Sequence, residues 1–181
     1  MRMIIQTIVH IFRDFLQPIT YLPLGILAGG IFLTGWGLQQ KRQPARERIR
    51  ITQRQWLTCL IIVYATVLLI LAFFSREPGS RTGVDLIPLS TWGTSAQAHA
   101  YFIENILMFI PFGILLPFRV PALRRALFCI DAGFLCSLLL ETAQLLTGRG
   151  YCQLDDIATN TLGTGLGYLI YRLWQRYGRK R

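Results

Sequence analysis

Long apolar runs, each close to the length needed to cross a bilayer, dominate this chain of 181 residues. A membrane-spanning helix needs about 20 consecutive, mostly apolar residues. The predicted spans are residues 18–38, 56–74, 101–118, 126–146 and 156–174. Only 15% of the residues are charged, against about 25% in soluble domains. The sequence therefore predicts an all-α polytopic membrane protein with about five transmembrane helices.

The basic residues predict how these spans are oriented. Fourteen of the 19 lie in alternate connections or after the last span, and short connections rich in Lys and Arg face the cytoplasm. We therefore expect a multi-pass protein of the cytoplasmic membrane with its N-terminus outside and its C-terminus inside. Because these residues flank spans, the net charge of +10 does not predict nucleic-acid binding. The fourteen are Lys41, Arg42, Arg46, Arg48, Arg50, Arg54, Arg119, Arg124, Arg125, Arg172, Arg176, Arg179, Lys180 and Arg181.

Residues 1–17 differ from the spans. Ile4, Ile8, Ile11 and Phe12 recur at helical spacing with polar residues opposite, but the stretch is too short to cross a membrane. It predicts an amphipathic helix lying on the outer leaflet. Packing of this helix against the rest of the protein is an equal alternative. Residues 18–181 are predicted to form one membrane domain.

Two G-x-x-x-G pairs are predicted helix-packing sites, because small residues let helix backbones approach closely in a membrane. They are Gly25 with Gly29 in the first span, and Gly163 with Gly167 in the last. The pairs could meet within one chain or between two, so an oligomer is possible.

Polar residues gather where the spans meet the predicted outer face. Ionisable groups at membrane depth are costly, so such a cluster is by default a functional-site hypothesis. It could be a satisfied buried network, with Glu141 paired to Arg149 and Asp156 capping a helix. It could instead be an outward-facing pocket with Glu141 at its centre and Arg149 as an anion contact. The candidate ligand-binding residues are Asn105, Glu141, Gln144, Arg149, Asp156 and Asn160.

Known catalytic signatures such as H-E-x-x-H and G-x-S-x-G do not occur in the sequence. If the protein is an enzyme, Glu141 or Asp156 would serve as general base. A metal site built from Glu141, Asp156 and His99 lacks the usual local ligand spacing, and no C-x-x-C pair suggests zinc. The sequence therefore predicts no metal and no cofactor, and leans away from catalysis.

An ordered set of motifs over residues 85–173 resembles the VanZ-like family. The resemblance implies a small multi-span bacterial membrane protein with a role in the cell envelope. The namesake of that family is linked to low-level resistance to the glycopeptide teicoplanin. The residues that carry the resemblance are Asn105, Ile106, Phe109, Pro111, Gly113, Pro117, Glu141, Gln144, Gly148, Arg149, Asp156, Asn160, Thr161, Gly163 and Gly167.

Three functions fit these patterns. The preferred one is a non-enzymatic envelope protein that takes an amphipathic lipid, a lipid-linked precursor or a lipoglycopeptide from the outer leaflet and supports glycopeptide tolerance. An intramembrane enzyme that modifies a lipid or cell-wall precursor is the second. The third is a scaffold whose polar cluster only holds helices together.

Overall fold

The computed structural model describes residues 2–14, 16–44, 51–79 and 81–178. Of the basic residues that predict the orientation, six lie outside these ranges: Arg46, Arg48, Arg50, Arg179, Lys180 and Arg181. The main helices are α1 (Arg2–Asp14), α2 (Leu16–Lys41), α3 (Gln53–Leu69), α4 (Ala96–Arg119), α5 (Ala126–Leu146) and α6 (Leu154–Gly178). A π-helical turn, η2 (Ile70–Phe74), extends α3. A 3-10 turn, η3 (Pro121–Arg124), joins α4 to α5. Two strands, β1 (Arg81–Asp85) and β2 (Arg149–Gln153), complete the fold.

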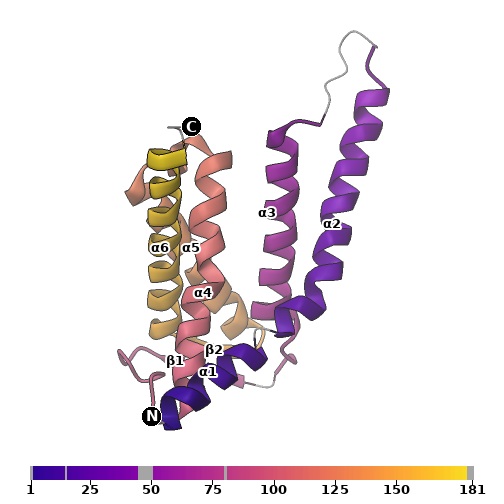
Figure 1. Ribbon diagram of the computed structural model, residues 1–181. Helices are drawn as coiled ribbons and strands as arrows, with labels where there is room; N and C mark the ends of the chain where they lie inside the picture. Colours follow the sequence, from indigo (N-terminus) through magenta and orange to yellow (C-terminus); the bar gives the residue numbers. More distant parts are fainter. Residues whose placement is uncertain (1, 15, 45–50, 80, 179–181) are drawn as a thin grey trace.

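The long helices run side by side in two groups, the pair α2–α3 and the bundle α4–α5–α6 (Figure 1). Four helical stretches of the described chain are long and apolar enough to cross a membrane: Arg2–Lys41, Gln53–Phe74, Ala96–Arg119 and Ala126–Leu146. α6 is not among them, although it runs alongside α4 and α5 (Figure 1). The prediction of an all-α polytopic membrane protein is confirmed, and four of the five predicted spans meet the length and apolarity criterion.

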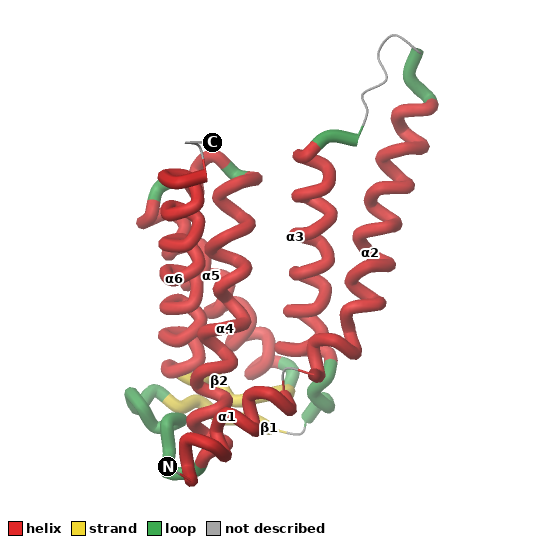
Figure 2. The backbone as a smooth tube through the Cα atoms, in the orientation of Figure 1, coloured by secondary structure: helices red, strands yellow, loops and turns green. Residues whose placement is uncertain are grey.

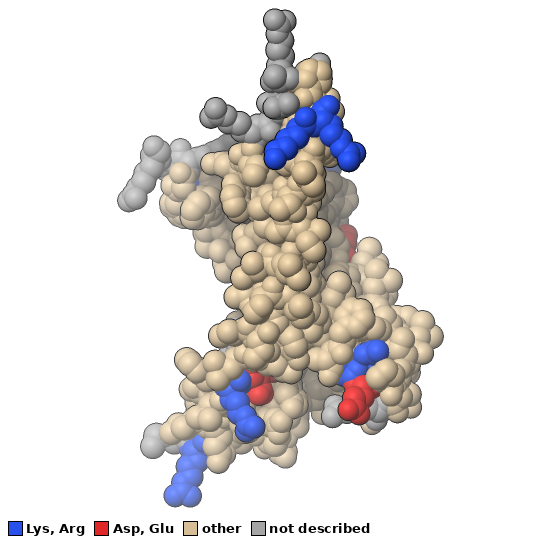
Figure 3. Space-filling model, turned by 90° about the vertical axis from the view of Figure 1, so that its right-hand side faces the viewer, with Lys and Arg blue, Asp and Glu red and all other residues tan. Residues whose placement is uncertain are grey.

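The two ends of the molecule differ. One end, here called the strand end, carries α1, β1 and β2, and the other, the C-terminal end, carries η3 and the last turn of α6 (Figure 2). On the face seen in Figure 3, most charged side chains lie toward these ends, and the broad belt between them carries few. Such a belt matches the apolar interior of a bilayer.

Glycines set the distance between α4 and α6. A Cβ atom on Gly163 would overlap the carbonyl oxygen of Ile106, and one on Gly167 would overlap that of Ile110. Gly113 of α4 meets the backbone of Thr164 in the same way. The two backbones are therefore in direct contact, within one chain.

The pair α2–α3 packs less tightly. A Cβ atom on Gly25 would lie 2.9 Å from the carbonyl oxygen of Val63, and one on Gly29 would lie 2.7 Å from Cys59 Sγ. Links from this pair to the bundle include a hydrogen bond from the Tyr64 hydroxyl to the Met108 carbonyl oxygen, at 3.0 Å.

Helix α1 lies across the strand end and runs obliquely to the spans (Figure 1). It packs against α4 and buries Thr7. Its apolar side chains Ile4, Ile8 and Phe12 remain 65%, 54% and 75% exposed. The helix therefore contacts the protein on one side and offers an apolar face to its surroundings on another.

Strands β1 and β2 form a two-stranded parallel sheet that the sequence did not predict (Figure 2). Gly83 pairs with Tyr151, and a Cβ atom there would lie 2.7 Å from the tyrosine ring. The sheet ties the segment after α3 to the connection between α5 and α6. It thereby closes the strand end around the polar residues of the spans.

Candidate functional site

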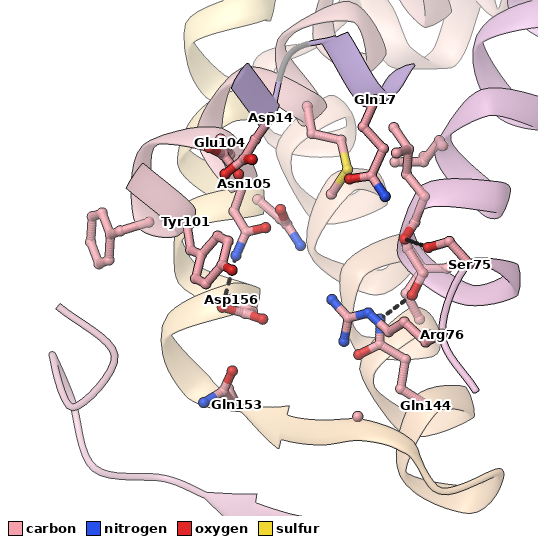
Figure 4. A pocket seen from close by; sticks show the side chains of 18 of the residues that line it. Asp14, Gln17, Ser75, Arg76, Tyr101, Glu104, Asn105, Gln144, Gln153 and Asp156 are labelled. Carbon is pink, nitrogen blue, oxygen red and sulfur yellow. Dashed lines mark hydrogen bonds between the residues drawn. The ribbon is translucent and has the colours of Figure 1, made fainter. Parts of the chain in front are cut away.

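A cavity of about 1070 Å³ lies at the strand end, between the pair α2–α3 and the bundle. Its apolar wall includes Tyr64 of α3, Leu71 of η2, Met108 and Pro111 of α4, and Leu140 of α5. Polar side chains from α1, α2, α4, α5, α6, β2 and the segment after η2 line the rest, and Figure 4 shows many of them around one space. Ligand sites commonly combine apolar walls with a few placed polar groups.

All six residues that the sequence singles out as ligand-binding line this cavity. They come from three helices and β2, and are brought together by the close contact of α4 with α6. The six are Asn105, Glu141, Gln144, Arg149, Asp156 and Asn160.

The two central carboxylates come from neighbouring helices. Glu141 of α5 is only 3% exposed and accepts a hydrogen bond from the backbone N–H of Gln153, at 3.1 Å. Asp156 of α6 accepts one from Asn105 Nδ2, at 2.8 Å (Figure 4). The two carboxyl groups interact electrostatically, and both line the cavity.

Two buried amides present their oxygens without a partner. Gln144 Nε2 donates to the Ala72 carbonyl oxygen at 2.6 Å, which fixes the direction of the amide. Asn160 Nδ2 lies 2.9 Å from the Ser137 hydroxyl. Gln144 Oε1 and Asn160 Oδ1 have no hydrogen-bond partner among the described residues, although these side chains are only 2% and 3% exposed. Buried acceptors of this kind call for a donor.

The two arginines of the cavity have different surroundings. Arg149 donates to the carbonyl oxygens of Phe73 (3.2 Å) and Arg76 (2.6 Å), and its guanidinium lies 4.8 Å from the centre of the Phe73 ring. It thus satisfies carbonyls at and just after the end of η2. The pairing of Arg149 with Glu141 was one of the alternatives that the sequence had suggested. The Arg76 side chain lies against Gly150, where an added Cβ atom would be 2.7 Å from its Nη1. Arg76 is the cation whose charge acts on both Glu141 and Asp156.

Helix α1 brings a further carboxylate to the cavity. Asp14, at its end, lies beside Glu104 of α4 (Figure 4), and the two carboxyl groups interact with each other. Glu104 Oε1 is buried and has no hydrogen-bond partner among the described residues. The N-terminal helix is therefore part of the cavity wall.

Asp155 fastens the segment before α4 to the start of α6. Its carboxylate accepts hydrogen bonds from the backbone N–H of Leu89 (2.7 Å) and from the N–H and hydroxyl of Thr91 (2.9 and 2.7 Å). Burial acts to raise the pKa of Asp155, but these hydrogen bonds outweigh it and hold the pKa below its usual value. Leu89 has a φ of 61°, a left-handed conformation that its bond to Asp155 helps to maintain.

Several cavity residues were not singled out from the sequence. Arg76 directly follows an apolar run and reads as an ordinary flanking charge, and Asp14 lies in a helix taken to be interfacial. His99, which the sequence offered as a metal ligand with Glu141, is not among the lining residues and packs against Trp92, with ring centres 4.2 Å apart and ring planes tilted by 38°. No pattern within one segment signals these placements, because each depends on how distant helices pack.

The fold and the cavity define a small polytopic α-helical membrane protein with a polar site at one end of its helix bundle. The chain belongs to the VanZ/LLP1 family, whose model matches residues 59–175. The match runs from within α3 to near the end of α6 and leaves out α1 and α2, which supply Asp14 and Gln17 to the cavity. No curated protein and no solved structure matches the chain.

Proposed function

We propose that the cavity binds the polar head of an amphipathic ligand taken from the outer leaflet, and that this binding supports glycopeptide tolerance. The candidate ligands are a membrane lipid, a lipid-linked cell-wall precursor or a lipoglycopeptide. The envelope role rests on the resemblance to the VanZ-like family, and the binding role rests on the cavity itself.

One observation supports the proposal: a single cavity of about 1070 Å³ is lined by apolar residues on one side and by polar residues on the rest. Pockets for small molecules typically enclose about 300–1,000 Å³, so this one has room for a head group and part of an apolar tail. An amphipathic molecule needs both kinds of surface.

The unpartnered acceptors argue against a purely structural cluster. A network that only held helices together would satisfy its buried oxygens, because each unsatisfied one costs about 1–3 kcal/mol. Gln144 Oε1 and Asn160 Oδ1 remain without a partner among the described residues. These groups are better explained as part of a binding surface.

The test compares teicoplanin susceptibility of bacteria that make the wild type, Glu141→Gln or Asp131→Asn at equal membrane abundance. Asp131 is the matched control, because it lies on the same helix but is exposed and outside the cavity lining. We expect the wild type and Asp131→Asn to protect and Glu141→Gln to lose protection. Equal protection by all three would rule out a role for the cavity, and protection by none would rule out the tolerance role.

A further inference from the structure

The charge of the cavity is opposite to that of the chain. The protein has a formal net charge of +10, whereas the cavity wall carries more carboxylates than guanidinium groups. A wall of one sign attracts ligands of the other. The acidic lining residues are Asp14, Glu77, Glu104, Glu141 and Asp156, and the basic ones are Arg76 and Arg149.

The basic groups are already engaged. Arg149 donates to two backbone carbonyls and lies over the Phe73 ring. Arg76 lies close to Gly150 and acts on Glu141 and Asp156, so its charge is offset inside the cavity. A phosphate head would have to displace these interactions and then face the surrounding carboxylates. The wall is therefore poorly suited to an anion.

Unpartnered oxygens add a second, independent indication. Gln144 Oε1, Asn160 Oδ1 and Glu104 Oε1 are all buried acceptors without a partner among the described residues, and all three side chains line the cavity. Each amide nitrogen donates to the protein, Gln144 Nε2 to the Ala72 carbonyl oxygen and Asn160 Nδ2 to the Ser137 hydroxyl. The three oxygens without a partner are acceptors, which a donor of the ligand can satisfy.

We propose that the head group bound here is an amine-bearing, hydroxyl-rich one, of the amino-sugar kind, and not a phosphate. This inference rests on the proposed binding function and names its ligand class. An ammonium group has three donors and no acceptor, which suits the carboxylates of Glu141 and Asp156. Sugar hydroxyls supply the further donors that the amide oxygens require.

The test uses the full chain in phosphatidylcholine nanodiscs and isothermal titration calorimetry, with empty nanodiscs subtracted. Three probes share an octyl tail: octyl glucosaminide with its amine protonated, octyl glucoside and octyl phosphate. Free glucosamine is the fourth probe and shows whether the tail is needed. We expect octyl glucosaminide to bind about tenfold more tightly than octyl glucoside, since hydrogen bonds to charged groups are the stronger ones. Octyl phosphate should show no saturable binding.

Two variants change the charge of the cavity in opposite directions. Glu141→Gln should remove most of the tenfold preference of the cavity for octyl glucosaminide over octyl glucoside. Arg76→Gln should strengthen binding of octyl glucosaminide, because it removes a competing cation. Asp131→Asn, outside the cavity, should match the wild type for every probe.

The outcomes separate this inference from the proposed function. Tightest binding of octyl phosphate, lost in Arg76→Gln, would overturn the amine-bearing head group and leave the binding function standing. Absence of saturable binding by any octyl probe would overturn both. Equal affinity for free glucosamine and octyl glucosaminide would support the head-group chemistry and overturn the lipid-tailed ligand.

Discussion

Gly163 and Gly165 lie two residues apart on α6 in opposite surroundings. A Cβ atom on Gly163 would overlap the Ile106 carbonyl oxygen, while one on Gly165 would meet nothing within 4 Å among the described residues. We predict that Gly163→Ala lowers the free energy of unfolding by about 1–3 kcal/mol, the usual cost of overpacking. Gly165→Ala should be neutral or slightly stabilising, because alanine favours a helix over glycine. Thermal unfolding of the purified variants measures the difference, and equal melting temperatures would contradict the close contact of α4 with α6.

Arg149 shows how one residue of the cavity can be structural. Its loss would leave the carbonyls of Phe73 and Arg76 without their donor, at a cost of about 1–3 kcal/mol. We predict that Arg149→Gln lowers the melting temperature of the ligand-free protein. Arg172→Gln on the exposed face of α6 is the control and should have no effect. An unchanged melting temperature for Arg149→Gln would instead favour a direct role in ligand binding.

Residue identity revealed which polar groups belong together, but not what each one does. Glu141, Gln144 and Asp156 stand out from the sequence because ionisable and amide groups are rare at membrane depth. The role of Arg149 could not be read in the same way, since its hydrogen bonds reach carbonyls more than 70 positions earlier in the chain. Arg76 has no local signal at all. Six of the polar residues that line the cavity could therefore be predicted from the sequence, whereas Arg76, Asp14 and the hydrogen bonds within the cavity could not.

At the scale of elements, the segment between β1 and α4 depends on α6. Both oxygens of Asp155 accept hydrogen bonds from Leu89 and Thr91. Asn at this position keeps the shape but turns an N–H₂ group toward one of those donors. We predict that Asp155→Asn speeds hydrogen exchange at the Leu89 and Thr91 amides, while Asp131→Asn leaves it unchanged. Wild-type exchange rates in Asp155→Asn would show that the segment is held by other contacts.

The pH dependence of this attachment follows from the lowered pKa of Asp155. A carboxylate whose pKa is lower in the folded state than in the unfolded state stabilises the fold at pH values above its unfolded-state pKa. That unfolded-state pKa is about 4 for aspartate. That contribution is lost only as the pH falls through the folded-state value. We therefore expect the protection factors of Leu89 and Thr91 to stay constant between about pH 8 and pH 5. A decline within that window would contradict the assignment.

Helices were easier to predict than strands for a physical reason. The signal for a span lies in one continuous stretch of sequence. The apolar run of residues 126–146, for example, predicts a span, and α5 has those same bounds. β1 and β2 are five residues each and are paired across α4 and α5, so neither carries a signal of its own. α6 falls between these cases: its polar residues and glycines lower its hydropathy, yet they are what packs it against α4.

At the scale of the whole molecule, many basic side chains and the acidic cavity lie at opposite ends. Basic side chains near the C-terminal end, such as Arg54, Arg119 and Arg124, belong to the side predicted to be cytoplasmic. The acidic cavity lies at the strand end, on the other side of the belt that carries few charges. The basic excess thus predicts the orientation, and the orientation in turn predicts that the cavity serves the outer leaflet.

That orientation can be tested with single cysteines in a background that lacks Cys59, Cys129, Cys136 and Cys152. Pro78 at the strand end and Ala122 in η3 are both exposed and lie at opposite ends of the molecule. We predict that a membrane-impermeant maleimide labels Pro78→Cys in intact cells and labels Ala122→Cys only after the membrane is broken. The positive-inside rule requires this order, because the connections near Ala122 carry the basic residues. The reverse pattern would place the acidic cavity on the cytoplasmic side, where a ligand from the outer leaflet could not reach it.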